Sequence, residues 1–193
     1  MITHIRGRLV EKNPTSVIID CSGVGYELHI SLNTYSLIGS EETIELYTHL
    51  QVKEDSHTLY GFVQKIEREV FRLLITVSGI GANTARTILS SLTSEELRGA
   101  IAAENVSKIQ SVKGIGAKTA QRLIIELKDK ILKIYEFDEV FPQQDNTVKE
   151  EALSALEVLG FSRKQAEKVV DAILSEEREL GVESVIKIAL KKL

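Results

Sequence analysis

Two short glycine-rich segments carry the residue types and spacing in this chain that are best suited to chemistry. Residues 77–86 read VSGIGANTAR and residues 112–121 read VKGIGAKTAQ, with seven of ten aligned positions identical. Glycine adopts backbone angles that other residues resist, and it lacks the Cβ atom that would hold a phosphodiester away from the backbone. The expected chemistry is phosphate binding by bare amide groups, at Gly79, Gly81, Gly114 and Gly116.

Helices must hold these segments in place. Apolar residues at helical spacing precede the first segment, from Ile66 to Val77, and residues 117–133 continue from the second as a long amphipathic pattern. A helix that begins directly after the glycines directs its unpaired N–H groups and the positive end of its dipole toward the same anion. Ile80 and Ile115, between the glycines, are expected to insert back into the helix pair.

This arrangement is the helix-hairpin-helix motif in two copies. Such a pair is typical of proteins that bind both DNA backbones across the minor groove without reading the bases. Lys113, Lys118 and Arg122 add basic side chains to the second hairpin, whereas the first offers Asn83 and Arg86. The candidate DNA-binding residues are Gly79, Gly81, Asn83, Arg86, Gly114, Gly116, Lys118 and Arg122.

The charge distribution favours an anionic ligand in the middle of the chain. The 193 residues carry a formal net charge of −4. Residues 1–63 contain 4 Lys or Arg against 8 Asp or Glu, residues 64–134 contain 12 against 7, and residues 135–193 contain 8 against 13. The middle segment, which holds both hairpins, is therefore basic, and it lies between two acidic ends.

Periodicity predicts a multidomain, mainly α-helical protein with an N-terminal β-barrel. Five strand patterns within residues 1–63, with a short helical turn at 34–38 capped by Asn33, predict a small closed barrel of the OB-fold type. Residues 64–134 form the tandem helix-hairpin-helix domain, which includes the capping box Thr93–Glu96.

The composition changes again beyond the hairpins. Residues 135–147 are rich in acidic residues, Gln and Pro and have little periodicity, so we expect a flexible linker. Residues 148–193 predict a minimal three-helix bundle, with helices at 148–159, at 162–175 with Ser162 as N-cap, and at 182–192.

Composition also excludes several classes of protein. Hydrophobic residues make up 43% and charged residues 27%, as in ordinary globular proteins. The longest apolar stretches fall far short of the roughly 20 residues of a membrane helix, and the N-terminus lacks the apolar core of a signal peptide. We therefore expect a cytoplasmic protein without membrane contact. The single cysteine, Cys21, is expected to be buried, and no metal or cofactor site is expected.

The order of barrel, paired hairpins, acidic linker and bundle resembles the RuvA family of bacterial Holliday-junction proteins. The resemblance rests also on Ile5-Arg6-Gly7, on the turn GVGYE at 23–27, and on Glu54-Asp55 followed by LYGF at 59–62. It implies a homotetramer that holds an open four-way DNA junction and recruits the RuvB ATPase for branch migration in recombination and repair. Whether one tetramer or two bind the junction stays open, and RuvC resolvase is a further partner to consider.

The resemblance assigns roles to residues outside the hairpins. An acidic pin would consist of Glu54 and Asp55, between the last two strands, where four copies would meet at the junction centre and repel phosphates. Composition alone favours a solvated hairpin tip at this position. Many members of the family have a lysine where this chain has Asn83, so its first hairpin is expected to bind more weakly or to rely on amides and Arg86.

The last segment, LEVLGFSRKQAEKVV, resembles a ubiquitin-associated (UBA-like) bundle with a Leu-Gly-Phe turn. In the RuvA family this bundle docks on RuvB. The candidate motor contacts are Leu156, Leu159 and Phe161. Packing in the core of the small bundle is the alternative for each of the three.

Two other function classes are weighed against a non-enzymatic DNA scaffold. Repair glycosylases and nucleases also use such hairpins, but Ala117-Lys118-Thr119-Ala120 stands where a glycosylase would supply its catalytic aspartate, and Glu54-Asp55 has no recognisable third carboxylate for Mg²⁺. A pure protein adapter would leave the hairpins unexplained. The chain has no P-loop motif, so any ATP-driven step belongs to a partner.

Overall fold

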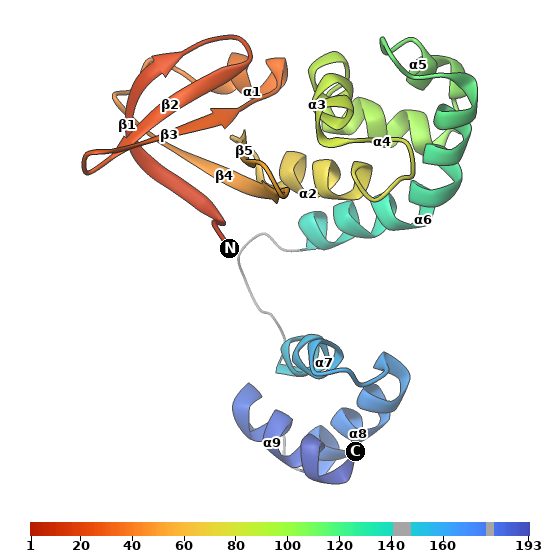
Figure 1. Ribbon diagram of the computed structural model, residues 1–193. Coiled ribbons are helices and arrows are strands. Elements are labelled where there is room, and N and C mark those ends of the chain that lie inside the picture. Colours follow the sequence, from red (N-terminus) through yellow and green to blue (C-terminus); the bar gives the residue numbers. More distant parts are fainter. Residues whose placement is uncertain (141–147, 177–179) are drawn as a thin grey trace. The chain divides into compact units, whose positions relative to one another are not determined.

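The computed structural model describes residues 1–140, 148–176 and 180–193. The chain separates into two compact units, Met1–Glu139 and Val140–Leu193. Figure 1 shows the first unit as a strand barrel beside a group of helices and the second as a helical bundle. The predicted fold class is confirmed. No helix in the described part of the chain is long and apolar enough to cross a membrane.

The barrel is closed by five strands, as predicted. They are β1 (His4–Lys12), β2 (Ser16–Cys21), β3 (Val24–His29), β4 (Thr43–Val52) and β5 (His57–Phe62). The strands close in the order β1-β2-β3-β5-β4, with β3 and β5 parallel and the other pairs antiparallel. Alternate residues such as Val17, Ile19 and Leu28 are fully buried inside. The alternation of apolar and polar residues in the sequence thus marks the side chains that face the inside of the barrel.

Helix α1 (Leu32–Leu37), between β3 and β4, corrects one prediction. Its N-cap is Ser31, whose hydroxyl accepts a backbone amide of the first turn at 2.9 Å. Asn33 is therefore inside the helix rather than its cap. The Asn33 side-chain amide donates instead to the carbonyls of Leu89 at 2.6 Å and Leu92 at 3.1 Å, near the end of another helix. A partner so distant in sequence leaves no local signal.

Five helices follow the barrel in the first unit. They are α2 (Lys65–Leu74), α3 (Ala82–Ser91), α4 (Ser94–Ala102), α5 (Val106–Gln110) and α6 (Ala117–Val140). The predicted capping box opens α4, with Glu96 N–H donating to Thr93 Oγ1 at 3.1 Å and Thr93 N–H to Glu96 Oε2 at 2.9 Å. Helix α6 continues past Lys133, where we expected it to end, to Val140. The rest of the predicted linker, 141–147, lies outside the described residues.

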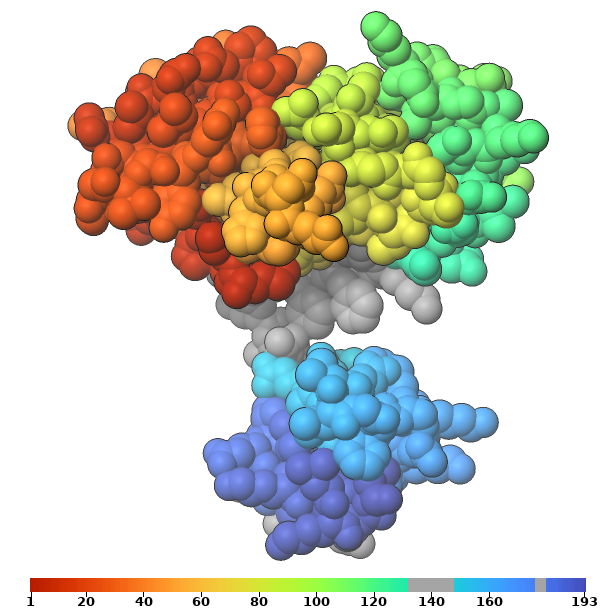
Figure 2. Space-filling model, in the orientation of Figure 1, coloured from red at the N-terminus to blue at the C-terminus, as the bar shows by residue number. Residues whose placement is uncertain are grey.

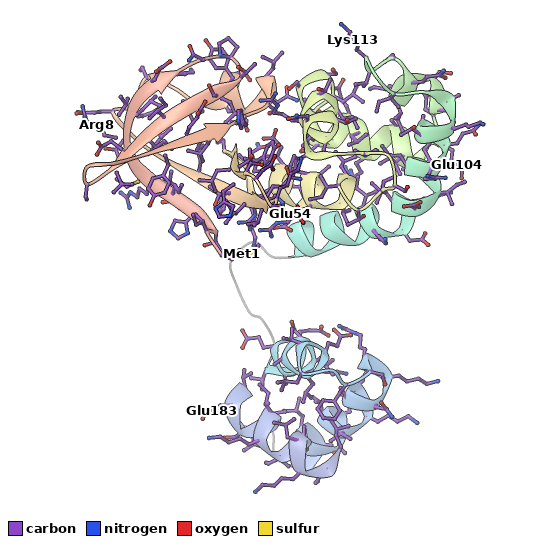
Figure 3. All side chains as sticks on the ribbon, in the orientation of Figure 1. Met1, Arg8, Glu54, Glu104, Lys113 and Glu183 are labelled. Carbon is purple, nitrogen blue, oxygen red and sulfur yellow. The ribbon has the colours of Figure 1, made fainter. Side chains whose placement is uncertain are left out.

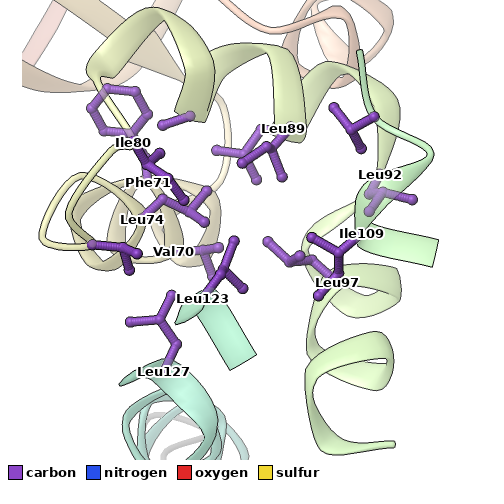
Figure 4. Close-up of a cluster of buried hydrophobic side chains, with 14 of the residues drawn as sticks. Val70, Phe71, Leu74, Ile80, Leu89, Leu92, Leu97, Ile109, Leu123 and Leu127 are labelled. Carbon is purple, nitrogen blue, oxygen red and sulfur yellow. The ribbon is translucent and has the colours of Figure 1, made fainter. Parts of the chain in front are cut away.

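One apolar core joins these helices to the barrel, and Figure 4 shows part of it. Phe71 of α2 is fully buried. Its ring centroid lies 4.9 Å from that of Tyr60 and 5.1 Å from that of Phe62, both on β5. Because β5 supplies side chains to the helical core, barrel and hairpins pack as one body. The predicted boundaries at residues 63, 134 and 147 remain predictions.

The second unit is a three-helix bundle of α7 (Val148–Val158), α8 (Arg163–Glu176) and α9 (Val182–Lys192). Its fully buried side chains include Leu153 and Leu156 from α7 and Val185 from α9. Ser162 precedes α8, but its hydroxyl donates to Gln165 Oε1 at 2.6 Å. Ser162 is at the expected N-cap position, since its carbonyl accepts the amide of Ala166 at 3.0 Å, but its hydroxyl bonds a side chain rather than the backbone.

Cys21 is another correction, because it is partly exposed. It ends β2, and its Sγ donates to the Arg6 carbonyl at 3.2 Å. The strands approach closely here, since a Cβ at Gly7 would lie 2.2 Å from the Asp20 carbonyl oxygen. Gly7 is therefore required by the packing of β1 against β2, and Cys21 packs against the barrel core without being fully buried.

Glu67 of α2 is a buried carboxylate where the barrel meets the helices. Its side chain is only 3% exposed and accepts the hydroxyls of Ser31 at 2.5 Å and Thr34 at 2.6 Å. Burial raises the pKa of Glu67, the two hydroxyl bonds oppose that shift, and Glu95 adds to it. A raised folded-state pKa means that the stabilising contribution is full below the unfolded pKa and is lost as pH rises through the folded pKa.

Replacing Glu67 with Gln should remove this pH dependence. The free energy of unfolding of Glu67→Gln, relative to the unchanged chain, should increase from pH 4.5 to pH 8, because only the carboxylate becomes charged in that range. Urea unfolding across the range measures the difference, with the exposed Glu41→Gln as control. If the difference in free energy of unfolding between the variant and the unchanged chain does not change with pH, the pKa of Glu67 is not raised.

Candidate nucleic-acid interface

The two hairpins have the same backbone geometry. Gly79 has φ +90° and Gly114 has φ +91°. In each hairpin the isoleucine amide closes the same turn onto the valine carbonyl three residues earlier, at 3.0 and 3.1 Å. Since this left-handed φ favours glycine, the sequence repeat is also a structural repeat.

Both hairpins leave their glycine amides open. A Cβ placed on any of the four glycines would meet nothing within 4 Å. Within the described residues, these four amides have no hydrogen-bond partner. Gly81 precedes α3 without a side-chain cap, and α6 begins directly after Gly116. Each hairpin therefore presents free N–H groups and the positive end of a helix dipole to an anion.

Ile80 and Ile115 attach the hairpins to the helical core. Their exposures are 4% and 5%, so the predicted insertion of both side chains is confirmed. The apolar side chain points inward and the glycines on either side face solvent. Burial of these two isoleucines fixes the direction in which the free amides point.

The second hairpin carries exposed positive charge. Lys113 and Lys118 are both exposed, and Figure 3 shows the Lys113 side chain extending from the outer end of the helical part. Neither lysine has an ion pair or hydrogen bond among the described residues. Arg122 Nη1 lies 3.4 Å from the carbonyl of Ser78, in the first hairpin. Arg122 thus connects the two hairpins.

The first hairpin directs its polar side chains toward the barrel. Asn83 Oδ1 accepts a bond from the hydroxyl of Tyr60 at 3.4 Å. Burial raises the pKa of Tyr60, and the nearby Arg86 opposes that shift. Arg86 Nη1 donates to the Thr15 carbonyl at 3.1 Å and lies 3.4 Å from His29 Nδ1. Sequence reasoning missed these barrel contacts, because nothing local couples α3 to the strands.

The expected acidic residues lie at the tip of the β4–β5 hairpin. Lys53 N–H donates to the Ser56 carbonyl at 2.8 Å and closes the turn. Glu54 and Asp55 are exposed between them, and Ser56 Oγ contacts Asp55 Oδ1 at 3.2 Å. Figure 2 shows β4 and β5, in orange, at the surface of the first unit that faces the viewer. Both carboxylates are therefore available to an outside charge.

The turn between α7 and α8 changes the choice of motor contacts. Leu156 has an exposure of 0% and is part of the bundle core, so it is not available to a partner. Leu159 is 56% exposed, and Phe161 is partly buried against the core. Val158, which the motif did not single out, is 85% exposed. A helical wheel could have placed Val158 opposite Leu156 before the structure was known.

Within the described residues, no three His, Cys, Asp or Glu side chains are grouped so that they could hold a metal ion.

Comparison with known proteins agrees with this three-part geometry. The RuvA N-terminal domain model matches residues 1–61, the SAM-like helix-hairpin-helix tandem model matches 71–129, and the RuvA C-terminal domain model matches 147–193. The chain is 65% identical to the Holliday junction branch migration complex subunit RuvA of Christiangramia forsetii over 193 residues, 100% of both chains. This chain belongs to the RuvA family.

Other RuvA proteins align just as completely. The Flavobacterium psychrophilum protein is 59% identical over 193 residues, and the Bacteroides thetaiotaomicron protein is 49% identical over 201, in each case across 100% of both chains. The two RuvA domain models fall on the barrel and on the bundle, and the tandem model falls on the hairpins. The family assignment therefore covers every described element that holds a candidate site.

Proposed function

We propose that this chain is a non-enzymatic subunit that binds four-way DNA junctions and recruits a RuvB ATPase for branch migration in recombination and repair. The observation that carries the proposal is the pair of hairpins with matching backbone geometry, held in one core with an acid-tipped barrel. The names of the relatives, Holliday junction branch migration complex subunits, support it. We expect the protein to act in the cytoplasm.

The hairpins would bind the sugar-phosphate backbone. Free amides at the four glycines and at the start of α3 donate hydrogen bonds to phosphate oxygens, and Lys118 adds a charge. None of these groups reads a base edge, so binding should depend on DNA shape and salt rather than on sequence. Glu54 and Asp55 would repel phosphates that approach the barrel tip.

Assembly would bring several tips together. We propose a homotetramer in which four copies of Glu54 and Asp55 surround the junction centre and keep the arms apart. A second tetramer on the opposite face of the DNA, and contact with the RuvC resolvase, are further parts of this proposal. ATP hydrolysis would belong to RuvB, which the C-terminal bundle would contact through Leu159, Val158 and the partly exposed side of Phe161.

Binding to a junction and to a linear duplex tests the proposal directly. An immobile four-way junction should bind at least tenfold more tightly than a duplex of equal arm length, because only the junction matches several hairpin pairs at once. Electrophoretic mobility shifts at one salt concentration measure both, and junctions of unrelated arm sequence are the control. Equal affinity for the two DNAs would overturn the proposal.

The acidic tip should control how well the protein distinguishes a junction from a duplex, rather than how tightly it binds the junction. In Glu54→Gln/Asp55→Asn, duplex binding should rise by about fivefold at low salt, since a carboxylate about 4 Å from a phosphate costs about 1 kcal/mol in water. Junction binding should change less, because its open centre lies over the tip. The rise in duplex affinity should be smaller near 0.15 M salt, because dissolved ions then screen charges that lie more than about 8 Å apart.

The control removes two carboxylates at the far end of β4. Glu41→Gln/Glu42→Gln changes the net charge equally and lies about 30 Å along the strand from the tip. If both double variants raise duplex affinity alike, the tip has no special role.

The C-terminal bundle should serve the motor and not the DNA. Deleting residues 148–193 removes one compact unit with its own core, so junction affinity should stay within twofold while stimulation of the RuvB ATPase is lost. Leu159→Ala should weaken the stimulation alone, because exposed substitutions rarely change stability by more than about 0.5 kcal/mol. Loss of junction binding in the truncation would contradict this division.

A further inference from the structure

The two hairpins are alike in backbone but differ in charge. At equivalent positions the first copy has Ser78, Asn83 and Thr87, and the second has Lys113, Lys118 and Arg122. The last residue of the repeated segment is the exception, because the first copy has the basic Arg86 where the second has Gln121. Matching turns and matching φ angles mean that both copies can offer the same amides. Any difference in how they bind phosphate must come from side chains.

Arg86, the basic residue of the first copy, is already bonded to the barrel side. Arg86 donates to the Thr15 carbonyl and lies against His29, both on the barrel side. Asn83 is likewise held by the Tyr60 hydroxyl. Arg86 is thereby bonded to the barrel, whereas Asn83 stays exposed and carries no charge. Asn33, at the other end of α3, holds two of its last carbonyls.

Two of the three cations of the second copy have no partner within the described residues. Lys113 and Lys118 stand on either side of Gly114 and Gly116, are exposed, and have no partner within the described residues. Arg122 is the exception, since it reaches the Ser78 carbonyl and Glu126. A phosphate at the second hairpin would meet the ammonium groups of Lys113 and Lys118, whereas a phosphate at the first would meet no ammonium group and only the Arg122 guanidinium, which is already bonded to the Ser78 carbonyl.

We propose that the two hairpins contribute differently to DNA binding. The second hairpin supplies most of the salt-dependent attraction through Lys113 and Lys118. The first makes an amide contact without a lysine of its own, and the barrel sets its position. The inference rests on the proposed DNA binding and names the residues that give it strength. Arg86 acts through the barrel as a positioning residue and is not a phosphate ligand, and Asn83 adds no charge.

The slope of log affinity against log salt tests this division, because each phosphate neutralised adds about 0.9 to its magnitude. Lys118→Gln and Lys113→Gln should each reduce the magnitude by about 0.9 per chain bound, a change of about 3.5-fold in the affinity ratio between about 50 and 200 mM salt. Arg86→Gln should keep the original slope, although it removes an equal charge. Lys168→Gln, on the C-terminal bundle, is the matched control for net charge.

A gain-of-charge variant makes the test independent of folding losses. Asn83→Lys places an ammonium group where the second copy has Lys118, and it should raise the magnitude of the slope by about 0.9 per chain bound. An unchanged slope in Asn83→Lys, or a reduced slope in Arg86→Gln equal to that in Lys118→Gln, would overturn the inference. Equal junction and duplex affinity would refute only the proposed function, because the slopes can be compared on either DNA.

Discussion

The packing of Phe71 against β5 is the contact on which the first unit depends. This ring of α2 lies within 5.4 Å of the rings of Tyr60, Phe62 and His49, measured between centroids. Aromatic contacts of this kind combine a large buried area with a preferred geometry. Because β4 and β5 also carry the acidic tip, one buried side chain links the position of the carboxylates to that of the hairpins.

A second constraint is that the hairpin amides, to be open to a phosphate as proposed, must stay unpaired in a fold that otherwise pairs its backbone. Buried amides without partners are costly, so such groups can exist only at the surface. The hairpins meet this constraint by burying Ile80 and Ile115 while the flanking glycines remain open. The same apolar residue therefore stabilises the fold and orients the site.

Hydrogen bonds between the barrel side and the helices fix the orientation of helices that the apolar core already holds together. Asn33 and Arg86 attach α3 to the barrel at separate points along the helix, and Glu67 attaches α2 to the residues around α1. In the C-terminal bundle, by contrast, the core takes Leu156 and leaves Val158 and Leu159 outside. A small bundle has few apolar residues to spare, so burial of Leu156 is what its stability requires.

The sequence by itself determined the barrel, the tandem hairpins and the bundle, because alternation, helical spacing and a glycine repeat are local patterns that follow directly from backbone geometry. It also identified the open glycines, and it predicts Lys118 as a phosphate contact. Only the tertiary structure decided that Asn33 binds the end of α3, that Arg86 turns to the barrel and that Leu156 is core. Each of these depends on groups far apart in the chain, whose approach is fixed by packing and leaves no trace in local spacing.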